Sequence, residues 1–202
     1  LGQIKEEQAK QPLPRPTVAG TPVLLLDAAQ TGMLMMAYSI TMAVVAPFSG
    51  QLSDKIGSEI LCFIGLSIVT AALLILSTLG LNSSLGVFLV GSMLMSFGMA
   101  MFQSPNTSLI MSTVPPNKVG ITGSMNGLAR NLGNIFGISV STLVLYQLMS
   151  SQLGYTVFSF VEGREEVFVF GMQWVYRTMA IISAIGAILT GLRWKNRGKK
   201  ED

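Results

Sequence analysis

The sequence lacks histidine entirely and has a single cysteine, Cys62, among its 202 residues. These absences exclude a disulfide framework, a zinc site of the usual Cys/His type and acid–base chemistry that depends on histidine. Charge is scarce as well, because only 11% of the residues are charged, whereas a typical soluble domain has about a quarter. We therefore expect no bound metal, no cofactor and no enzymatic activity.

The net charge of +3 is small and concentrated near the C-terminus, which argues against nucleic acid as a partner. What the sequence does have is apolar residues: 50% are hydrophobic, and the mean hydropathy is +0.57. The same numbers exclude intrinsic disorder. This composition predicts an integral membrane protein whose first partner is the lipid bilayer.

Five apolar stretches are long enough to cross a bilayer core of ~30 Å, which takes ~20 helical residues. Their length argues against buried strands, and the absence of apolar–polar alternation argues against a transmembrane β-barrel. We therefore expect an all-α polytopic membrane protein with a helical bundle over residues 32–194. The predicted helices cover residues 32–49, 60–79, 85–105, 121–149 and 174–192.

Lysine and arginine indicate the orientation, because they gather in short cytoplasmic loops. If the connection between the first two helices is cytoplasmic, the outer side holds only Arg164 and Arg177. The inner side then holds Lys55, Lys118, Arg130, Arg193, Lys195, Arg197, Lys199 and Lys200. This distribution predicts a multi-pass protein of the cell membrane with a basic cytoplasmic tail at residues 195–202.

The N-terminal residues 1–31 form a polar linker whose Lys5, Lys10 and Arg15 also indicate a cytoplasmic position. Five helices with a cytoplasmic C-terminus would leave this linker outside. We therefore expect that one more helix belongs before the first span and is missing. The chain begins at Leu1 without an initiator methionine, so we expect a fragment or a processed product.

The long outer connection, residues 150–173, contains two β-prone apolar runs on either side of Gly163. The runs cover residues 156–161 and 166–170. This pattern is typical of a β-hairpin. A re-entrant segment or a helical extension is the alternative.

A motif of spaced glycines with an acid and a base lies between the first two predicted helices. It resembles the loop signature G-x-L-x-D-[RK]-x-G of the major facilitator superfamily, and its position between two spans supports the resemblance. The sequence departs from the family afterwards, where Ser58 and Glu59 replace the usual basic residues. The residues that carry the motif are Gly50, Leu52, Asp54, Lys55 and Gly57.

The stretch of residues 123–137 is similar to the fourteen-helix drug:proton antiporter branch of this superfamily. The resemblance extends over about residues 32–194 and corresponds to the last five helices of the C-terminal half. It implies an incomplete C-terminal half of a transporter in which two six-helix halves rock around a midplane site. The partner that this implies is the missing N-terminal half.

The helix predicted over residues 121–149 has one polar face, because Asn126, Arg130 and Asn134 are spaced four residues apart. Together with Gln103 and Asn106 of the preceding helix, we expect these residues to line a substrate cavity. The alternative for Arg130 is that its side chain reaches the lipid headgroups.

The same helix carries two pairs of glycines spaced for close helix packing. They are Gly123 with Gly127 and Gly133 with Gly137. In the preceding helix, Pro105 either ends the helix or kinks it.

No aspartate or glutamate lies deep in a predicted span, so the sequence offers no site for proton coupling. We expect efflux of drugs or other amphipathic small molecules, cationic ones included, by proton-coupled alternating access once the N-terminal half is present. The alternative is a half-size membrane interaction or assembly remnant without transport of its own.

Overall fold

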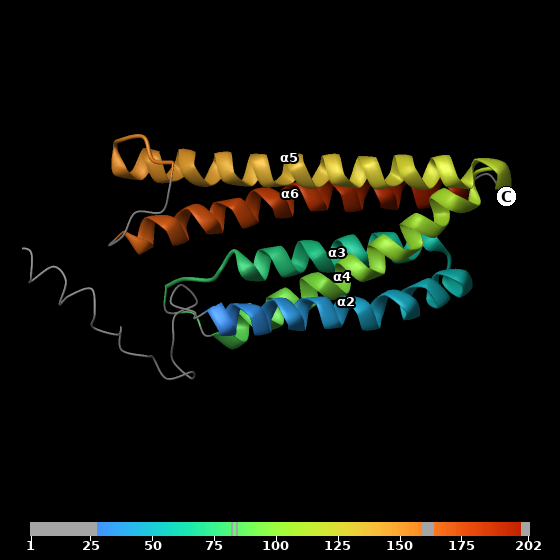
Figure 1. Ribbon diagram of the computed structural model, residues 1–202, viewed down its shortest axis with the longest axis horizontal. Helices are drawn as coiled ribbons and strands as arrows, with labels where there is room; N and C mark the ends of the chain where they lie inside the picture. The colour runs from blue at the N-terminus through green and yellow to red at the C-terminus, as the bar shows by residue number, and fades with distance from the viewer. Residues whose placement is uncertain (1–27, 82, 84, 159–163, 199–202) are drawn as a thin grey trace, which may run out of the picture.

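The computed structural model describes residues 28–81, 83, 85–158 and 164–198, and these contain helices but no strand. Successive long helices run in opposite directions along the length of the molecule (Figure 1). They are α2 (Ala28–Ile56), α3 (Ser58–Leu76), α4 (Leu85–Ser112), α5 (Val119–Leu153) and α6 (Glu165–Gly198), with a short 3₁₀ helix, η2 (Pro116–Lys118), before α5.

The centre of the bundle is α3, which packs against both α4 and α6. Helix α2 packs mainly on α4, and α5 packs mainly on α6, so α5 lies far from α2 (Figure 1). The small buried core lies where the central helices meet, at Val69, Leu73 and Ala180. Most of the apolar surface of the outer helices therefore remains uncovered by the described part of the chain.

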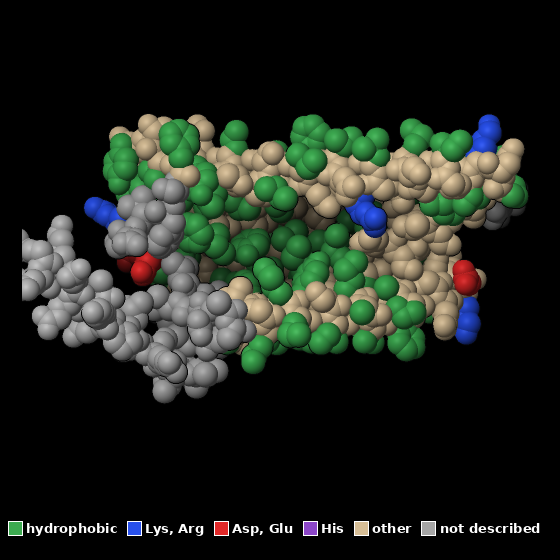
Figure 2. Space-filling view, viewed as in Figure 1, with side chains coloured by type: hydrophobic (Ala, Val, Ile, Leu, Met, Phe, Trp, Pro, Cys, Tyr) green, Lys and Arg blue, Asp and Glu red, His purple; other side chains and the backbone are tan. Residues whose placement is uncertain are grey.

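All five long helices are long and apolar enough to cross a membrane. Large hydrophobic side chains such as Phe136 and Ile181 lie more than half exposed, and hydrophobic side chains cover much of the surface in Figure 2. Such a surface is unfavourable in water and favourable against lipid tails. The predicted all-α polytopic membrane fold is thereby confirmed.

The helices differ in extent from the predicted spans. Helix α2 begins before residue 32, so it includes the end of the predicted linker, and it continues past residue 49 to Ile56. Helices α5 and α6 are also longer than predicted at both ends, and α6 includes the start of the predicted tail. Hydropathy marks only the apolar part of a helix, whereas the helix itself continues until its backbone hydrogen bonds end. Helix α3 alone ends before its predicted boundary, at Leu76, with Ser77 in the C-cap position.

Pro105 lies inside α4 and is fully buried, and the helix continues to Ser112. The structure thus decides between the two alternatives: the proline does not end the helix. Proline has no N–H to donate, so it leaves the carbonyl of Met101, one turn earlier, without its usual helical partner.

The predicted outer hairpin is wrong in its second arm, because residues 166–170 belong to α6. Glu165 and Glu166 occupy the first turn of α6, where carboxylates interact favourably with the helix dipole. Phe170 also stacks edge-on with Trp174 one turn later, at 6.3 Å between ring centroids. The helical alternative holds here. Of the first arm, residues 159–161 lie outside the described residues.

Two glycines bring the backbones of α3 and α4 into direct contact. A Cβ atom built on Gly65 would lie 2.7 Å from the Phe102 amide nitrogen and 2.8 Å from the Gly98 carbonyl oxygen. A Cβ on Gly98 would in turn lie 2.8 Å from the Gly65 carbonyl oxygen. This reciprocal contact sets the distance between α3 and α4, and therefore the position of the α4 face opposite α5.

Candidate functional site

A cavity of about 230 Å³ lies between α4 and α5 and brings together side chains from both helices. Four of the five residues predicted to line a cavity meet here. Asn134, the fifth, lies one turn further along α5 and is exposed. The lining residues are Met99, Phe102, Gln103, Asn106 and Thr107 of α4 with Asn126 and Arg130 of α5.

The spacing along each helix explains how these residues come to face the same cavity. Residues three and four positions apart share one face of an α-helix. On α4 this relation joins Met99 to Gln103 and Gln103 to Asn106, and on α5 it joins Asn126 to Arg130. Two helix faces that are polar for about one turn each thus form the walls of the cavity.

The polar groups of the cavity are available to a ligand. Thr107 donates its hydroxyl proton to the backbone carbonyl oxygen of Gln103 at 2.9 Å. The side-chain amides of Gln103, Asn106 and Asn126 make no hydrogen bond to any described residue. Each amide therefore offers two N–H donors and one carbonyl acceptor.

Arg130 is the only charged residue that lines the cavity. Within the described part of the chain it forms no ion pair. Three of the four described carboxylates, Asp54, Glu165 and Glu166, are exposed near helix ends. The cavity therefore has a positive electrostatic character that no nearby lining carboxylate offsets.

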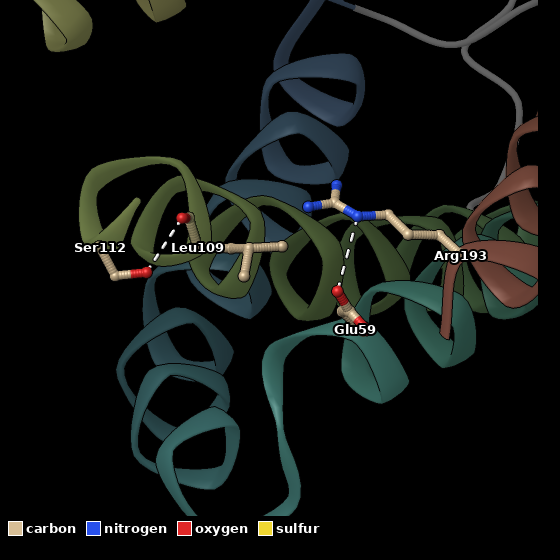
Figure 3. Close-up of polar contacts among 4 residues, drawn as sticks. All are labelled: Glu59, Leu109, Ser112 and Arg193. Atoms are coloured by element: carbon tan, nitrogen blue, oxygen red, sulfur yellow. Dashed lines mark hydrogen bonds and ion pairs between the residues drawn. The ribbon is translucent and has the colours of Figure 1, made fainter. Parts of the chain in front are cut away.

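The fourth carboxylate, Glu59, is buried at the start of α3, does not line the cavity and pairs with an arginine of α6. Its Oε1 atom lies 3.5 Å from Nε of Arg193 in α6, as Figure 3 shows. This ion pair links the first turn of α3 to α6 at the end of the bundle that also holds Lys55. Burial of Glu59 is tolerated because the guanidinium compensates its charge.

The apolar wall of the cavity consists of Met99 and Phe102. Met99 also packs against the core of Val69, Leu73 and Ala180, so this wall rests on the central helices. Helix α4 also carries Met93, Met95, Met101 and Met111, of which Met93 is exposed. Of the methionines of α4, only Met99 lines the cavity.

A second and larger cavity, of about 550 Å³, lies between α2, α4 and α6. Its walls are mainly aromatic and apolar and include Tyr38, Phe88 and Tyr176. Beside it, Ser96 of α4 donates a hydrogen bond to the Tyr38 carbonyl oxygen at 2.6 Å. No pattern along the chain predicts this cavity, because its residues come from three separate helices.

The motif of residues 50–57 forms the end of α2 and the tight connection to α3. A Cβ on Gly50 would meet Ser104 Oγ of α4 at 3.3 Å, so this glycine lies at a close approach. Leu52, Asp54 and Lys55 are exposed. Ser53 and Ser58 hydrogen-bond to each other through their hydroxyl groups at 2.7 Å across the connection.

Gly57 is the single residue between α2 and α3, and it has φ 98° and ψ 136°. Its N–H donates to the Ser53 carbonyl oxygen at 2.9 Å. This backbone conformation lies outside the regions that residues with a Cβ adopt. The last glycine of the motif is therefore required by the turn.

Gly57→Ala is expected to destabilise the protein by about 1–3 kcal/mol, because alanine is strained at this φ and ψ. Thermal unfolding of the full gene product in detergent measures the loss. Gly120→Ala is the matched control, since Gly120 is an exposed helical residue with open space around its Cβ position. Equal stability of the two variants would contradict the strain argument.

The glycines predicted for helix packing lie on a largely open stripe of α5. A Cβ on Gly123 would meet only Met111 Cε at 3.4 Å, and one on Gly127, Gly133 or Gly137 would meet no described atom within 4 Å. Within the described chain, close packing instead involves Gly65 and Gly98. A packing role for the α5 glycines stays a prediction that needs a partner outside these residues.

The sequence also matches a known family of membrane proteins. The sequence profile described as Major Facilitator Superfamily matches residues 16–202. The chain belongs to this superfamily. Its members are membrane carriers and not enzymes, in agreement with the expectation from the sequence.

Individual relatives of this superfamily match at moderate identity. The riboflavin transporter RibZ of Clostridioides difficile is 28% identical over 165 residues, which cover 82% of this chain and 35% of the relative. The multidrug resistance protein Stp of Mycobacterium tuberculosis is 30% identical over 61% of this chain and 23% of its own length. The tetracenomycin C resistance and export protein of Streptomyces glaucescens is 27% identical over 64% of this chain. The chain thus spans about a third or less of these curated relatives.

Proposed function

We propose that this chain is part of the C-terminal half of an exporter for amphipathic small molecules, in the fourteen-helix drug:proton antiporter branch. The observation that carries the proposal is the cavity between α4 and α5, where Gln103, Asn106, Asn126 and Arg130 meet an apolar wall. Pockets of this kind, largely apolar with a few convergent polar groups, are typical of small-molecule sites. Membership in a superfamily of membrane carriers supports transport as the activity of this cavity.

The relatives support export as the direction of transport. One is named as a multidrug resistance protein and another as a resistance and export protein. The relative named as a riboflavin transporter widens the substrate class to polar heteroaromatic compounds. For this chain we propose drugs or similar amphipathic molecules as the broad substrate class.

The exposed face of α5 supports a partner half. This helix contacts mainly α6, and its apolar residues Leu132 and Phe136 flank the open glycine stripe. Small residues beside large apolar ones are typical of close helix packing in membranes. We propose that the N-terminal half of the transporter packs on this face and that the Gly123–Gly137 stripe allows the approach.

The orientation follows from the basic residues. Lys55, Lys118 and Arg193 lie toward the same end of the bundle, because the helices alternate in direction. The positive-inside rule makes this end cytoplasmic, so the C-terminus is cytoplasmic in the cell membrane. For proton coupling we propose a carboxylate beyond the described residues, because the described carboxylates, Asp54, Glu59, Glu165 and Glu166, all lie in the first or last turn of a helix.

The test is transport by the full gene product in proteoliposomes with an imposed pH gradient. We expect a fluorescent amphipathic dye to cross the membrane in the direction opposite to the flow of protons, and a protonophore to abolish this movement. Protein-free vesicles and vesicles with an unrelated carrier are the controls. Dye movement that persists without the gradient would contradict proton coupling, and no movement of any amphipathic probe would contradict the transport proposal.

The alternative function is that of a half-size membrane assembly subunit without transport. The uncovered apolar faces of α2 and α5 are the observation in its favour, with Met33 and Ile121 each more than 60% exposed. Under this alternative, the gene product forms a stable complex with another membrane protein, and no vesicle assay detects transport.

A further inference from the structure

The charge of the cavity between α4 and α5 discriminates among amphipathic substrates. Its lining includes one guanidinium, that of Arg130, and no carboxylate. This guanidinium attracts anionic groups and repels cationic ones, with a strength that depends on the local dielectric. A cationic headgroup in this cavity would meet Arg130 without any compensating acid, whereas an anionic headgroup would neutralise it.

The hydrogen-bonding groups of the cavity point to the same preference. The amides of Gln103, Asn106 and Asn126 and the guanidinium of Arg130 have N–H donors that no described residue uses. Thr107 contributes no donor, because its proton is donated to the Gln103 carbonyl. Carboxylate, sulfonate and phosphate groups each carry at least two acceptor oxygens. Arginine can bind two oxygens of such a group at once through two parallel hydrogen bonds.

The size and the apolar wall determine what else the substrate carries. A cavity of about 230 Å³ holds a polar headgroup with one or two rings and is smaller than a site for a whole drug-sized molecule. Met99 and Phe102 form the surface on which a ring can lie, and both thioethers and aromatic rings pack well against aromatic rings.

We propose that this cavity selects amphipathic anions: compounds with an aromatic or apolar ring and a carboxylate, sulfonate or phosphate group. The anionic group binds Arg130 together with the Asn126 and Gln103 amides, and the ring lies on Phe102 and Met99. This inference rests on the proposed transport function and narrows its substrate class. Cationic amphiphiles are the substrates that it disfavours at this site.

The experiment compares two probes that share one ring system and differ in charge. Naphthalene sulfonate and naphthyl trimethylammonium are measured for binding to, and transport by, the full gene product in vesicles of phosphatidylcholine. We expect the anion to bind on the order of tenfold more tightly than the cation, the difference expected for one charged hydrogen-bonded contact. Equal affinity, or preference for the cation, would overturn the inference while leaving the transport function intact. Failure of both probes to bind would instead count against the cavity as the substrate site.

Variants assign the preference to Arg130. Arg130→Gln is expected to remove the tenfold preference for the anion, and Arg130→Lys to keep most of it. Arg130 is exposed and forms no ion pair with a described residue. Both variants are therefore expected to fold, and size-exclusion profiles in detergent check this. Arg177→Gln is the matched control, since Arg177 lies on α6 with its guanidinium 5.2 Å from the Trp174 ring centroid. An anion preference that survives Arg130→Gln would overturn the assignment.

An anionic lipid headgroup has the same chemistry as the proposed substrate. Vesicles that contain phosphatidylglycerol distinguish the two sources. If the lipid headgroup occupies the cavity, naphthalene sulfonate binds several-fold more weakly in these vesicles, and Arg130→Gln removes the difference. If free amphiphiles are the ligand, the added lipid weakens binding of naphthalene sulfonate only through the negative surface potential, and therefore by the same factor in the parent and in Arg130→Gln. Each result retains an anion at Arg130 and identifies its source.

Discussion

Replacing Gly65 by alanine is expected to destabilise the protein by about 1–3 kcal/mol, the usual cost of overpacking a tight contact. The added methyl group would lie 2.7 Å from the Phe102 amide nitrogen and 2.8 Å from the Gly98 carbonyl oxygen. Both atoms belong to the backbone of α4, so no side chain can rotate away. Relief requires α4 to move away from α3.

The control for this prediction is Gly186→Ala in α6. This glycine is also inside a helix, but its Cβ position meets only Leu66 Cδ1 at 3.8 Å, an ordinary contact. Alanine favours the helix over glycine by about 1 kcal/mol, so this variant is expected to be as stable as the parent or more stable. Thermal unfolding of the full gene product in detergent compares the two. A Gly65→Ala variant that matches Gly186→Ala would mean that α3 and α4 are not in backbone contact.

Asn126→Trp is expected to lower transport of amphipathic probes at least about tenfold, because the ring would occupy the space in which the substrate binds. Asn126 lines the cavity of about 230 Å³ opposite Phe102 and Gln103. A tryptophan side chain fills most of such a volume and removes an amide donor at the same time. Initial rates of probe transport in proteoliposomes measure the effect.

Leu128→Trp is the matched control for the filled cavity. Leu128 follows two residues later on α5, is 58% exposed and does not line the cavity. Both variants introduce the same side chain into the same helix, so insertion into the membrane should be affected alike. Transport that is equally reduced in both variants would indicate a general defect of α5, and transport that is retained in Asn126→Trp would place the substrate elsewhere.

The polar face of α5 illustrates which residues of a cavity can be predicted from spacing along one helix. The spacing of Asn126 and Arg130 predicts a shared face, since four residues make about one helical turn. The same spacing includes Asn134, which is exposed and outside the cavity. Periodicity assigns a residue to a face of its helix, but the length of the contact depends on where the neighbouring helix crosses.

The glycines show a second limit. The spacing of Gly123, Gly127, Gly133 and Gly137 predicts close packing on α5, whereas the described glycines whose Cβ would meet a neighbouring helix backbone within 3 Å are Gly65 and Gly98. Neither of those belongs to a spaced pair that the sequence analysis singled out. Close approach is a property of two helices at once, so a pattern on one helix cannot identify its partner.

The sequence by itself determined that lipid surrounds this protein and that five helices cross the membrane. It also showed the resemblance of the chain to the major facilitator superfamily. These properties depend on local hydropathy and on short motifs, which need no knowledge of distant contacts. Only the tertiary structure decided that α4 continues through Pro105 and brings Gln103 and Asn106 opposite Asn126 and Arg130. The physical reason is that the cavity lies between the faces of two separate helices, and the position of one of them, α4, depends on its contact with α3 at Gly65 and Gly98.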